Sequence, residues 1–144
     1  MSRRVRLRQL PGRLTTGVFI VNSGLSKRHA DDDTAAALHG MAAVAYPFLH
    51  SIPPRRFVRL VSAGELALGT VLLLPVVPSM VAGAALTAFS AGLLGLYLRL
   101  PEMRAEGSLR PTQQGLTIAK DVWMFGIGLG LLIDGLGDDE CRPH

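Results

Sequence analysis

Four ionisable side chains lie inside apolar stretches or at their ends, where a charge is costly. Glu65 is near the middle of the apolar run 57–74. An acidic residue at the centre of a membrane helix costs roughly 2.5 to 3.5 kcal/mol, so it normally faces other helices or water and has a partner. Lys27 ends the preceding apolar stretch, and Lys120 and Asp121 open the last one. A carboxylate beside a lysine in a membrane can bind a polar headgroup or exchange a proton, so these four residues are the candidate site.

Four further residues are secondary candidates for the same pocket. Three of them share one face of a helix-like stretch, and the fourth is a tryptophan near the start of the last apolar segment. A wet or interfacial helix face is the simpler interpretation of the first three, and a membrane-interface position is the simpler one for the tryptophan. These residues are His39, Tyr46, His50 and Trp123.

Metal and thiol chemistry are not indicated. Asp31, Asp32 and Asp33 are more typical of a helix start than of a metal site. Cys141 is the only cysteine, which excludes an intramolecular disulfide and a CxxC redox couple. We therefore predict no metal and no cofactor held by the chain itself, apart from a bound quinone or lipid.

Composition indicates a membrane protein. Of 144 residues, 49% are hydrophobic and 18% charged, and mean hydropathy is +0.33. The apolar residues fall in long blocks, and the polar ones are too few to clothe a soluble core made of these blocks. The net charge of +4 comes from basic residues that flank the blocks, where they contact lipid headgroups, so we do not expect nucleic acid as a partner.

These blocks predict an all-α, antiparallel bundle of four transmembrane helices. The predicted spans are residues 10–26 (or from Arg13), 57–74, 80–98 and 115–136. The membrane domain is expected to occupy residues 1–137, followed by a polar tail at 138–144, and the acidic stretch from Asp134 onward is expected to be disordered.

The first loop is expected to carry an additional helix. Residues 34–50 have apolar side chains recurring on one face, and Asp31 to Asp33 are placed to cap the N-terminus. Pro47 interrupts this stretch and Pro53 and Pro54 close it. A helix of this length is expected to lie in the interface or to re-enter the bundle rather than to cross the bilayer.

Four antiparallel spans bring the candidate residues to the membrane side opposite the termini. Lys27 ends the first span there, Glu65 lies roughly 12 Å inside the second span and Lys120 roughly 7 Å inside the fourth, at 1.5 Å per residue. We predict that Glu65 pairs with Lys120 or Lys27. Two interpretations stay open: the charges only lock the helix packing, or they form a small-molecule or proton-handling site.

Three short motifs carry a family resemblance. They are GLSK at Gly24–Lys27, GELALG at Gly64–Gly69 and AKDVWM at Ala119–Met124. Between about Arg13 and Asp134 the chain resembles the DoxX family. The resemblance implies a four-helix protein of the bacterial inner membrane, in a family named after a thiosulfate:quinone oxidoreductase subunit. Some members are associated with redox-stress assemblies or quinone chemistry, and the family's polar positions correspond to Lys27, Glu65, Lys120 and Asp121.

Three functions follow as expectations. The first is an accessory membrane subunit without catalysis of its own, which contacts membrane lipid, docks a partner protein or a second copy of itself, and binds a quinone-like lipid. The second is a quinone-linked oxidoreductase component in which Glu65 takes a proton and Lys120 stabilises its charge. The third is a small transporter or channel. The basic arm at Arg3–Arg8 favours cytoplasmic termini.

Overall fold

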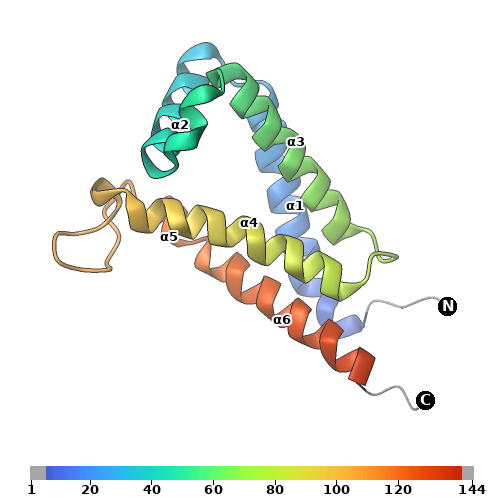
Figure 1. Cartoon of the computed structure of the whole chain (residues 1–144). Coiled ribbons are helices and arrows are strands. Elements are labelled where there is room, and N and C mark those ends of the chain that lie inside the picture. The colour runs from blue at the N-terminus through green and yellow to red at the C-terminus, as the bar shows by residue number, and fades with distance from the viewer. Residues whose placement is uncertain (1–5, 141–144) are drawn as a thin grey trace.

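The protein is all-helical. The computed structural model describes the backbone of residues 6–140 and the side chains of residues 6–137 (Figure 1). Within these residues there is no strand, only an isolated β-bridge between Arg104 and Pro111. The elements are η1 (Leu7–Gln9), α1 (Leu10–Arg28), α2 (Asp32–Ala45), η2 (Pro47–Ser51), α3 (Pro54–Leu73), α4 (Ser79–Arg99), η3 (Pro101–Met103), α5 (Leu116–Ala119) and α6 (Val122–Glu140).

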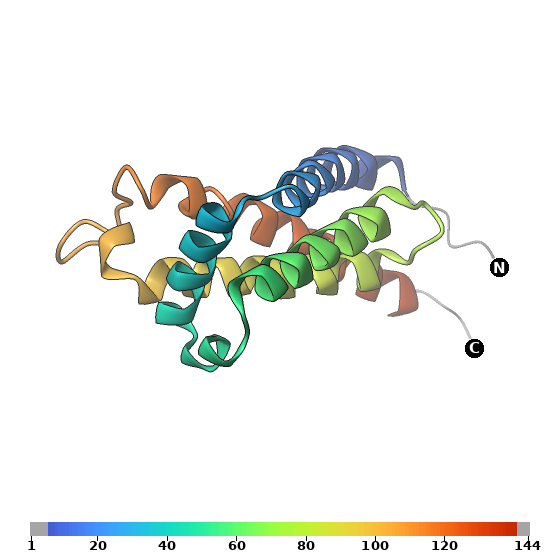
Figure 2. The ribbon, with the colours of Figure 1, turned by 90° about the horizontal axis from the view of Figure 1, so that it is seen from above.

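The four long helices form two antiparallel pairs, α1 with α3 and α4 with α6. The pairs lie together near the chain termini and diverge toward the other end (Figure 1). Helix α2 packs against α3 and α4 in this opening, and it runs across the long helices rather than along them (Figure 2).

Small residues allow the two helices of each pair to approach each other closely. A Cβ on Gly24 of α1 would lie 3.1 Å from the carbonyl oxygen of Ser62 on α3. A Cβ on Gly83 of α4 would lie 2.8 Å from the carbonyl oxygen of Gly128 on α6. Helices that associate through small residues in this way bring their backbones into van der Waals contact, as is common inside membranes.

Two apolar clusters hold the elements together. The first is built by all four long helices and comprises Ile20, Leu68, Leu72, Ala82, Leu86, Met124 and Leu131. The second fixes α2 against the end of α4 and against η3, and comprises Ala42, Ala45, Leu96, Tyr97, Leu100 and Met103.

The predicted loop helix is present as α2, with its cap. Asp31 precedes the helix, and its carboxylate accepts a hydrogen bond from the Thr34 backbone nitrogen at 2.8 Å. The helix ends at Ala45, earlier than the expected His50, because Pro47 cannot donate a helical hydrogen bond and begins η2 instead.

The fourth predicted span is not one continuous helix. A turn at Lys120 and Asp121 separates the single turn of α5 from α6. The expected disorder from Asp134 is also wrong for the residues that are described, because α6 continues to Glu140. The remainder of the predicted polar tail, residues 141–144, lies outside the described residues.

Two segments are long and apolar enough to cross a membrane: Ser79–Arg99 and Leu116–Gly137. Only 33% of the first and 17% of the second is buried inside the protein, so most of their apolar surface faces outward. Helices α1 and α3 do not meet the same criterion of hydropathy and charge.

Candidate functional site

A buried ion pair joins α1 to α3. The Lys27 ammonium lies 2.9 Å from Glu65 Oε1 and 3.1 Å from Oε2, and it also donates to Ser23 Oγ at 2.6 Å. The Glu65 side chain is 6% exposed and that of Lys27 24% exposed. The predicted pairing of Glu65 with Lys27 is therefore observed, and the ammonium is the part of the pair that solvent or a ligand reaches.

The local sequence explains why this pair forms. Gly24 lies directly against α3, where an added Cβ would be 3.2 Å from Cβ of Glu65. The Ser62 hydroxyl donates to the Gly24 carbonyl at 2.7 Å, which fixes the register of the two helices. Lys27 is in the last turn of α1, where a positive charge also interacts favourably with the helix dipole.

Asp121 is the third member of the site. It immediately precedes α6, and its carbonyl oxygen accepts the Phe125 backbone hydrogen bond at 3.1 Å. The half-buried carboxylate interacts electrostatically with both Lys27 and Glu65. The start of a helix is a favourable place for an acidic residue, so α6 helps to hold this charge.

Lys120 does not join the site. Its side chain is exposed and forms no hydrogen bond or ion pair with the described part of the chain. Successive helical residues do not share a face, so when Asp121 turns inward Lys120 turns outward. The predicted alternative pairing of Glu65 with Lys120 is therefore wrong, and the break between α5 and α6 is the structural reason.

None of the four secondary candidates joins the Lys27–Glu65 pair, and two of them, His39 and Tyr46, hold α2 in place. His39 Nε2 lies 2.9 Å from the Leu49 carbonyl oxygen. The Tyr46 hydroxyl donates to the Gly92 carbonyl oxygen at 2.7 Å. His50 and Trp123 are exposed.

Arg99 holds Tyr46 and the end of α2 from the side of α4. Its guanidinium lies 4.8 Å above the Tyr46 ring, and Nη1 donates to the Ala45 carbonyl oxygen at 3.0 Å. A cation that binds the last carbonyl of a helix also interacts favourably with the helix dipole. These contacts link α2 to the α4–α6 pair.

A groove of about 580 Å³ lies beside the ion pair, between the C-terminal half of α1 and the start of α2. Its walls combine hydroxyl, amide and charged groups with two large apolar side chains. The lining residues are Phe19, Asn22, Ser23, Ser26, Lys27, His29, Ala30, Asp31, Thr34 and Leu38. Lys27 therefore connects the buried pair to a space that a ligand could occupy.

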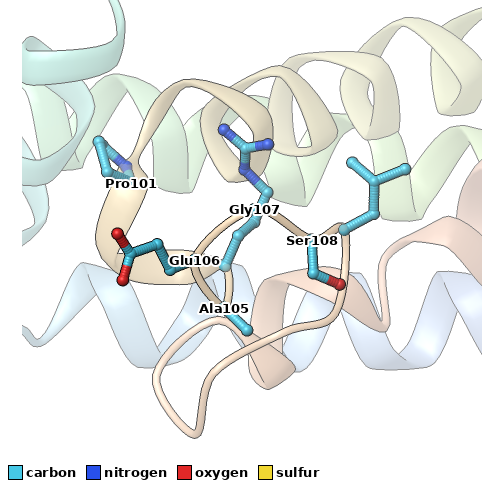
Figure 3. Close-up of a pocket in the computed structure, with 7 residues that line it drawn as sticks. Pro101, Ala105, Glu106, Gly107 and Ser108 are labelled. Carbon is cyan, nitrogen blue, oxygen red and sulfur yellow. The ribbon is translucent and has the colours of Figure 1, made fainter.

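A second hollow of about 450 Å³ lies in the loop after η3 (Figure 3). Seven residues of this one loop line it: Pro101, Arg104, Ala105, Glu106, Gly107, Ser108 and Leu109. It belongs to a different part of the molecule and includes none of the candidate residues.

Sequence reasoning missed Arg13, whose side chain is the most deeply buried charge in the described chain. The residue is 1% exposed, and its guanidinium caps the C-terminal end of α3 without a carboxylate partner. It donates to the carbonyl oxygens of Leu72 at 2.9 Å, Val71 at 3.1 Å, Leu74 at 2.8 Å and Val77 at 3.1 Å. The sequence signal for this contact was an arginine within the first turns of an apolar helix. The turn that it contacts, after α3, is bracketed by Pro75 and Pro78.

A polar cluster near the chain termini was also missed. The Asp134 carboxylate of α6 pairs with Arg8 and accepts a hydrogen bond from the Gln9 amide. The Ser79 hydroxyl donates to Gln9 Oε1 at 2.6 Å, which connects this cluster to the start of α4. These contacts tie the two helix pairs together at the end where they converge.

Among the described side chains, residues 6–137, no group of three or more His, Cys, Asp or Glu is arranged to bind a metal. Comparison with protein-family models, with curated proteins and with solved structures gives no match. The site therefore has to be interpreted from its own geometry and from the motif resemblance described above.

Proposed function

We propose that this protein is a four-span membrane protein of the DoxX type that serves as an accessory subunit of a quinone-associated assembly in the bacterial inner membrane. Its termini lie on the cytoplasmic side. The site formed by Lys27, Glu65 and Asp121 holds the polar headgroup of a quinone-like lipid, and the subunit needs no catalysis of its own.

The membrane setting is supported by the reversed polarity of α1. Its buried positions include Arg13 and Thr16, at 1% and 5% exposed, whereas Val18 and Phe19 on the outside are 60% and 62% exposed. In water this arrangement would place apolar side chains in solvent and bury a charge. In a bilayer it is favourable, because lipid covers the apolar face, the end of α3 satisfies Arg13, and the Thr16 hydroxyl donates to the Gly12 carbonyl oxygen of its own helix.

Helix length is consistent with this setting. Helices α1 and α3 have 19 and 20 residues, which is roughly 28 to 30 Å at 1.5 Å per residue. The hydrocarbon core of a bilayer is about 30 Å thick. The lower hydropathy of α3 comes mainly from Arg55, Arg56 and Arg59, which are exposed in its first two turns, and in smaller part from the inward-facing Glu65.

The observation that carries the ligand proposal is the position of Lys27 between Glu65 and the groove. Glu65 fixes the ammonium, while the groove of about 580 Å³ gives a headgroup access to it. Buried ionisable groups in membrane proteins are functional candidates by default, and binding pockets combine apolar walls with a few placed polar groups. The resemblance at GLSK, GELALG and AKDVWM supports quinone association.

A second candidate function is a quinone-linked oxidoreductase component. It is favoured by the ion pair of Glu65 with Lys27 and by a second carboxylate, Asp121, that interacts electrostatically with this pair without contacting it. Quinone reduction takes up two electrons and two protons, and these carboxylates would deliver protons while a partner subunit supplies the electrons. Lys27 then takes the charge-stabilising role first expected of Lys120.

Lipid analysis of the purified protein tests the first proposal. The wild type, extracted in mild detergent, should retain quinone, and the variant Lys27→Met with Glu65→Leu should lose most of it while staying folded. Lys120→Met is the matched control and should retain the wild-type amount. Equal quinone in all three proteins, or none in the wild type, contradicts the proposal. Quinone reduction by the isolated wild type would favour the second candidate.

A further inference from the structure

We propose that the groove between α1 and α2 binds an uncharged amphipathic molecule whose headgroup carries carbonyl acceptors, with the headgroup at Lys27 and the apolar part on Phe19 and Leu38. This inference rests on the proposed membrane setting and specifies the ligand class and its position. A short-chain quinone and a glycerolipid share this chemistry.

The charge balance of the groove favours an uncharged headgroup. Lys27 is already neutralised by the two short contacts to Glu65. An anionic ligand would have to compete with Glu65 for the ammonium, and a cationic ligand would be repelled by it. A carbonyl oxygen needs only one donated hydrogen bond and does not displace Glu65. The other carboxylate on the groove wall, Asp31, is engaged at the N-terminus of α2, where it accepts a hydrogen bond from the Thr34 backbone nitrogen.

Lys27 can supply that hydrogen bond without losing its ion pair. An ammonium carries three donors, and one of them is now directed to Ser23 Oγ at 2.6 Å, within the same helix. A ligand carbonyl that takes the place of the Ser23 hydroxyl receives a charge-assisted hydrogen bond, which is about twice as strong as a neutral one. Ser23, Asn22 and Ser26 line the same part of the groove and can complete the headgroup contacts.

The apolar part of the ligand has a defined surface one helical turn away. Phe19 lies four residues before Ser23 on α1, a rise of roughly 6 Å at 1.5 Å per residue. Its ring lines the groove and is 62% exposed on the outer side of the helix. Leu38 faces it from α2. A chain leaving the headgroup site can therefore continue along Phe19 toward the lipid-facing surface of α1.

The start of α2 forms the opposite wall and is held in position. Thr34 and Asp31 line the groove from this side. The next residue, Asp32, forms an ion pair with Arg55 at the beginning of α3. The ion pair at Asp32 ties the start of α2 to the start of α3, which is itself paired with α1.

Tryptophan fluorescence tests whether the ligand binds beside position 19, and the native Trp123 serves as the matched control. One reporter is Phe19→Trp combined with Trp123→Phe, and the other is the wild type, whose single tryptophan is Trp123. The two positions are 62% and 69% exposed, so they meet lipid to a similar extent. Each protein in phosphatidylcholine nanodiscs is titrated with decylubiquinone and, separately, with a dibrominated diacylglycerol, both of which quench tryptophan.

The expected result is saturable quenching at position 19 and linear, partition-type quenching at Trp123. Saturation by decylubiquinone identifies a quinone ligand, and saturation only by the diacylglycerol identifies a glycerolipid. Adding Lys27→Met and Glu65→Leu to the reporter should raise the apparent Kd of the saturable quenching about tenfold. This corresponds to a loss of about 1.4 kcal/mol of binding free energy. Linear quenching of equal slope at both positions with both probes would overturn the inference.

The two proposals fail in different ways. Quinone that co-purifies while position 19 shows no saturable quenching leaves the proposed function intact and places the ligand elsewhere. Saturable quenching by the diacylglycerol, with no quinone co-purifying, keeps the groove as a lipid site and removes the quinone association.

Discussion

At the scale of residues, the two charged side chains that are most deeply buried, Glu65 and Arg13, each have a dedicated set of partners. Glu65 has the Lys27 ammonium, and Arg13 has the carbonyl oxygens at the end of α3. Taking a charge out of water costs several kcal/mol unless its hydrogen bonds are replaced. The stability of the fold therefore depends on these two sets of contacts.

The Lys27–Glu65 pair predicts a non-additive mutant cycle. Lys27→Met leaves a buried carboxylate unpaired and should destabilise the protein by about 3 to 5 kcal/mol. Adding Glu65→Leu removes that carboxylate and should restore most of the loss. Thermal unfolding in detergent measures both effects. Additive losses in the double variant would show that the two residues are not coupled.

Lys120→Met is the control for this cycle. Lys120 is exposed and has no ion-pair partner within residues 6–137, so its replacement should change the unfolding free energy by less than about 0.5 kcal/mol. A loss as large as that of Lys27→Met would mean that the sequence-based pairing of Glu65 with Lys120 was the right one.

Arg13 predicts a different effect, because its partners are backbone groups. Arg13→Met should destabilise the protein by at least about 3 kcal/mol, since hydrogen bonds to a charged group contribute about 1.5 to 3 kcal/mol each and four are lost. Arg110→Met, at an exposed position, is the control. A Tm for Arg13→Met equal to that of the control would mean that the cap at the end of α3 contributes nothing.

At the scale of elements, close packing within each helix pair depends on a few small residues. On α4, Gly83 faces the backbone of α6, whereas an added Cβ on Gly92 meets nothing within 4 Å. The same helix therefore contains a glycine required by packing and one that is not. In the α1–α3 pair, Gly24 allows the same close backbone contact, directly beside the candidate site.

These two glycines predict opposite effects of the same substitution. Gly83→Ala should destabilise the protein by about 1 to 3 kcal/mol, because overpacking forces the α4 and α6 backbones apart. Gly92→Ala should stabilise it by up to about 1 kcal/mol, because alanine favours a helix. Chemical denaturation of the two variants in parallel gives the comparison. Stabilisation in both variants would contradict the close contact between α4 and α6.

The all-helical class and the loop helix could be predicted from the sequence, from apolar block length and from Asp31 as a cap. Depth counted from helix ends reduced the partners of Glu65 to Lys27 and Lys120 but did not distinguish between them. Lys120 was misplaced because a break between two apolar helical stretches leaves no mark in the pattern. Arg13 was missed because its partners are carbonyl oxygens at the end of α3, which no side-chain pattern reports.

At the scale of the whole molecule, the two helix pairs converge near the termini and diverge toward the site, with α2 in the opening (Figures 1 and 2). Helix α2 is held by Arg99 and Tyr46 on one side and by Arg55 on the other. The groove beside Lys27 exists because α2 lies across the opening instead of extending the bundle. Its position therefore determines both the shape of the groove and its accessibility.

The proposed four-span bundle requires successive loops to lie on opposite sides of the membrane. The side from which each loop can be labelled is therefore the most direct measurement. In sealed inner-membrane vesicles, a membrane-impermeant maleimide can be applied to the native Cys141 and, in a Cys141→Ser background, to Val76→Cys and Gly107→Cys. We predict that Cys141 and the cysteine at position 76 react from one side and that at position 107 only from the other. Labelling of all three positions from the same side would show that α4 and α6 do not cross the membrane and would contradict a four-span bundle.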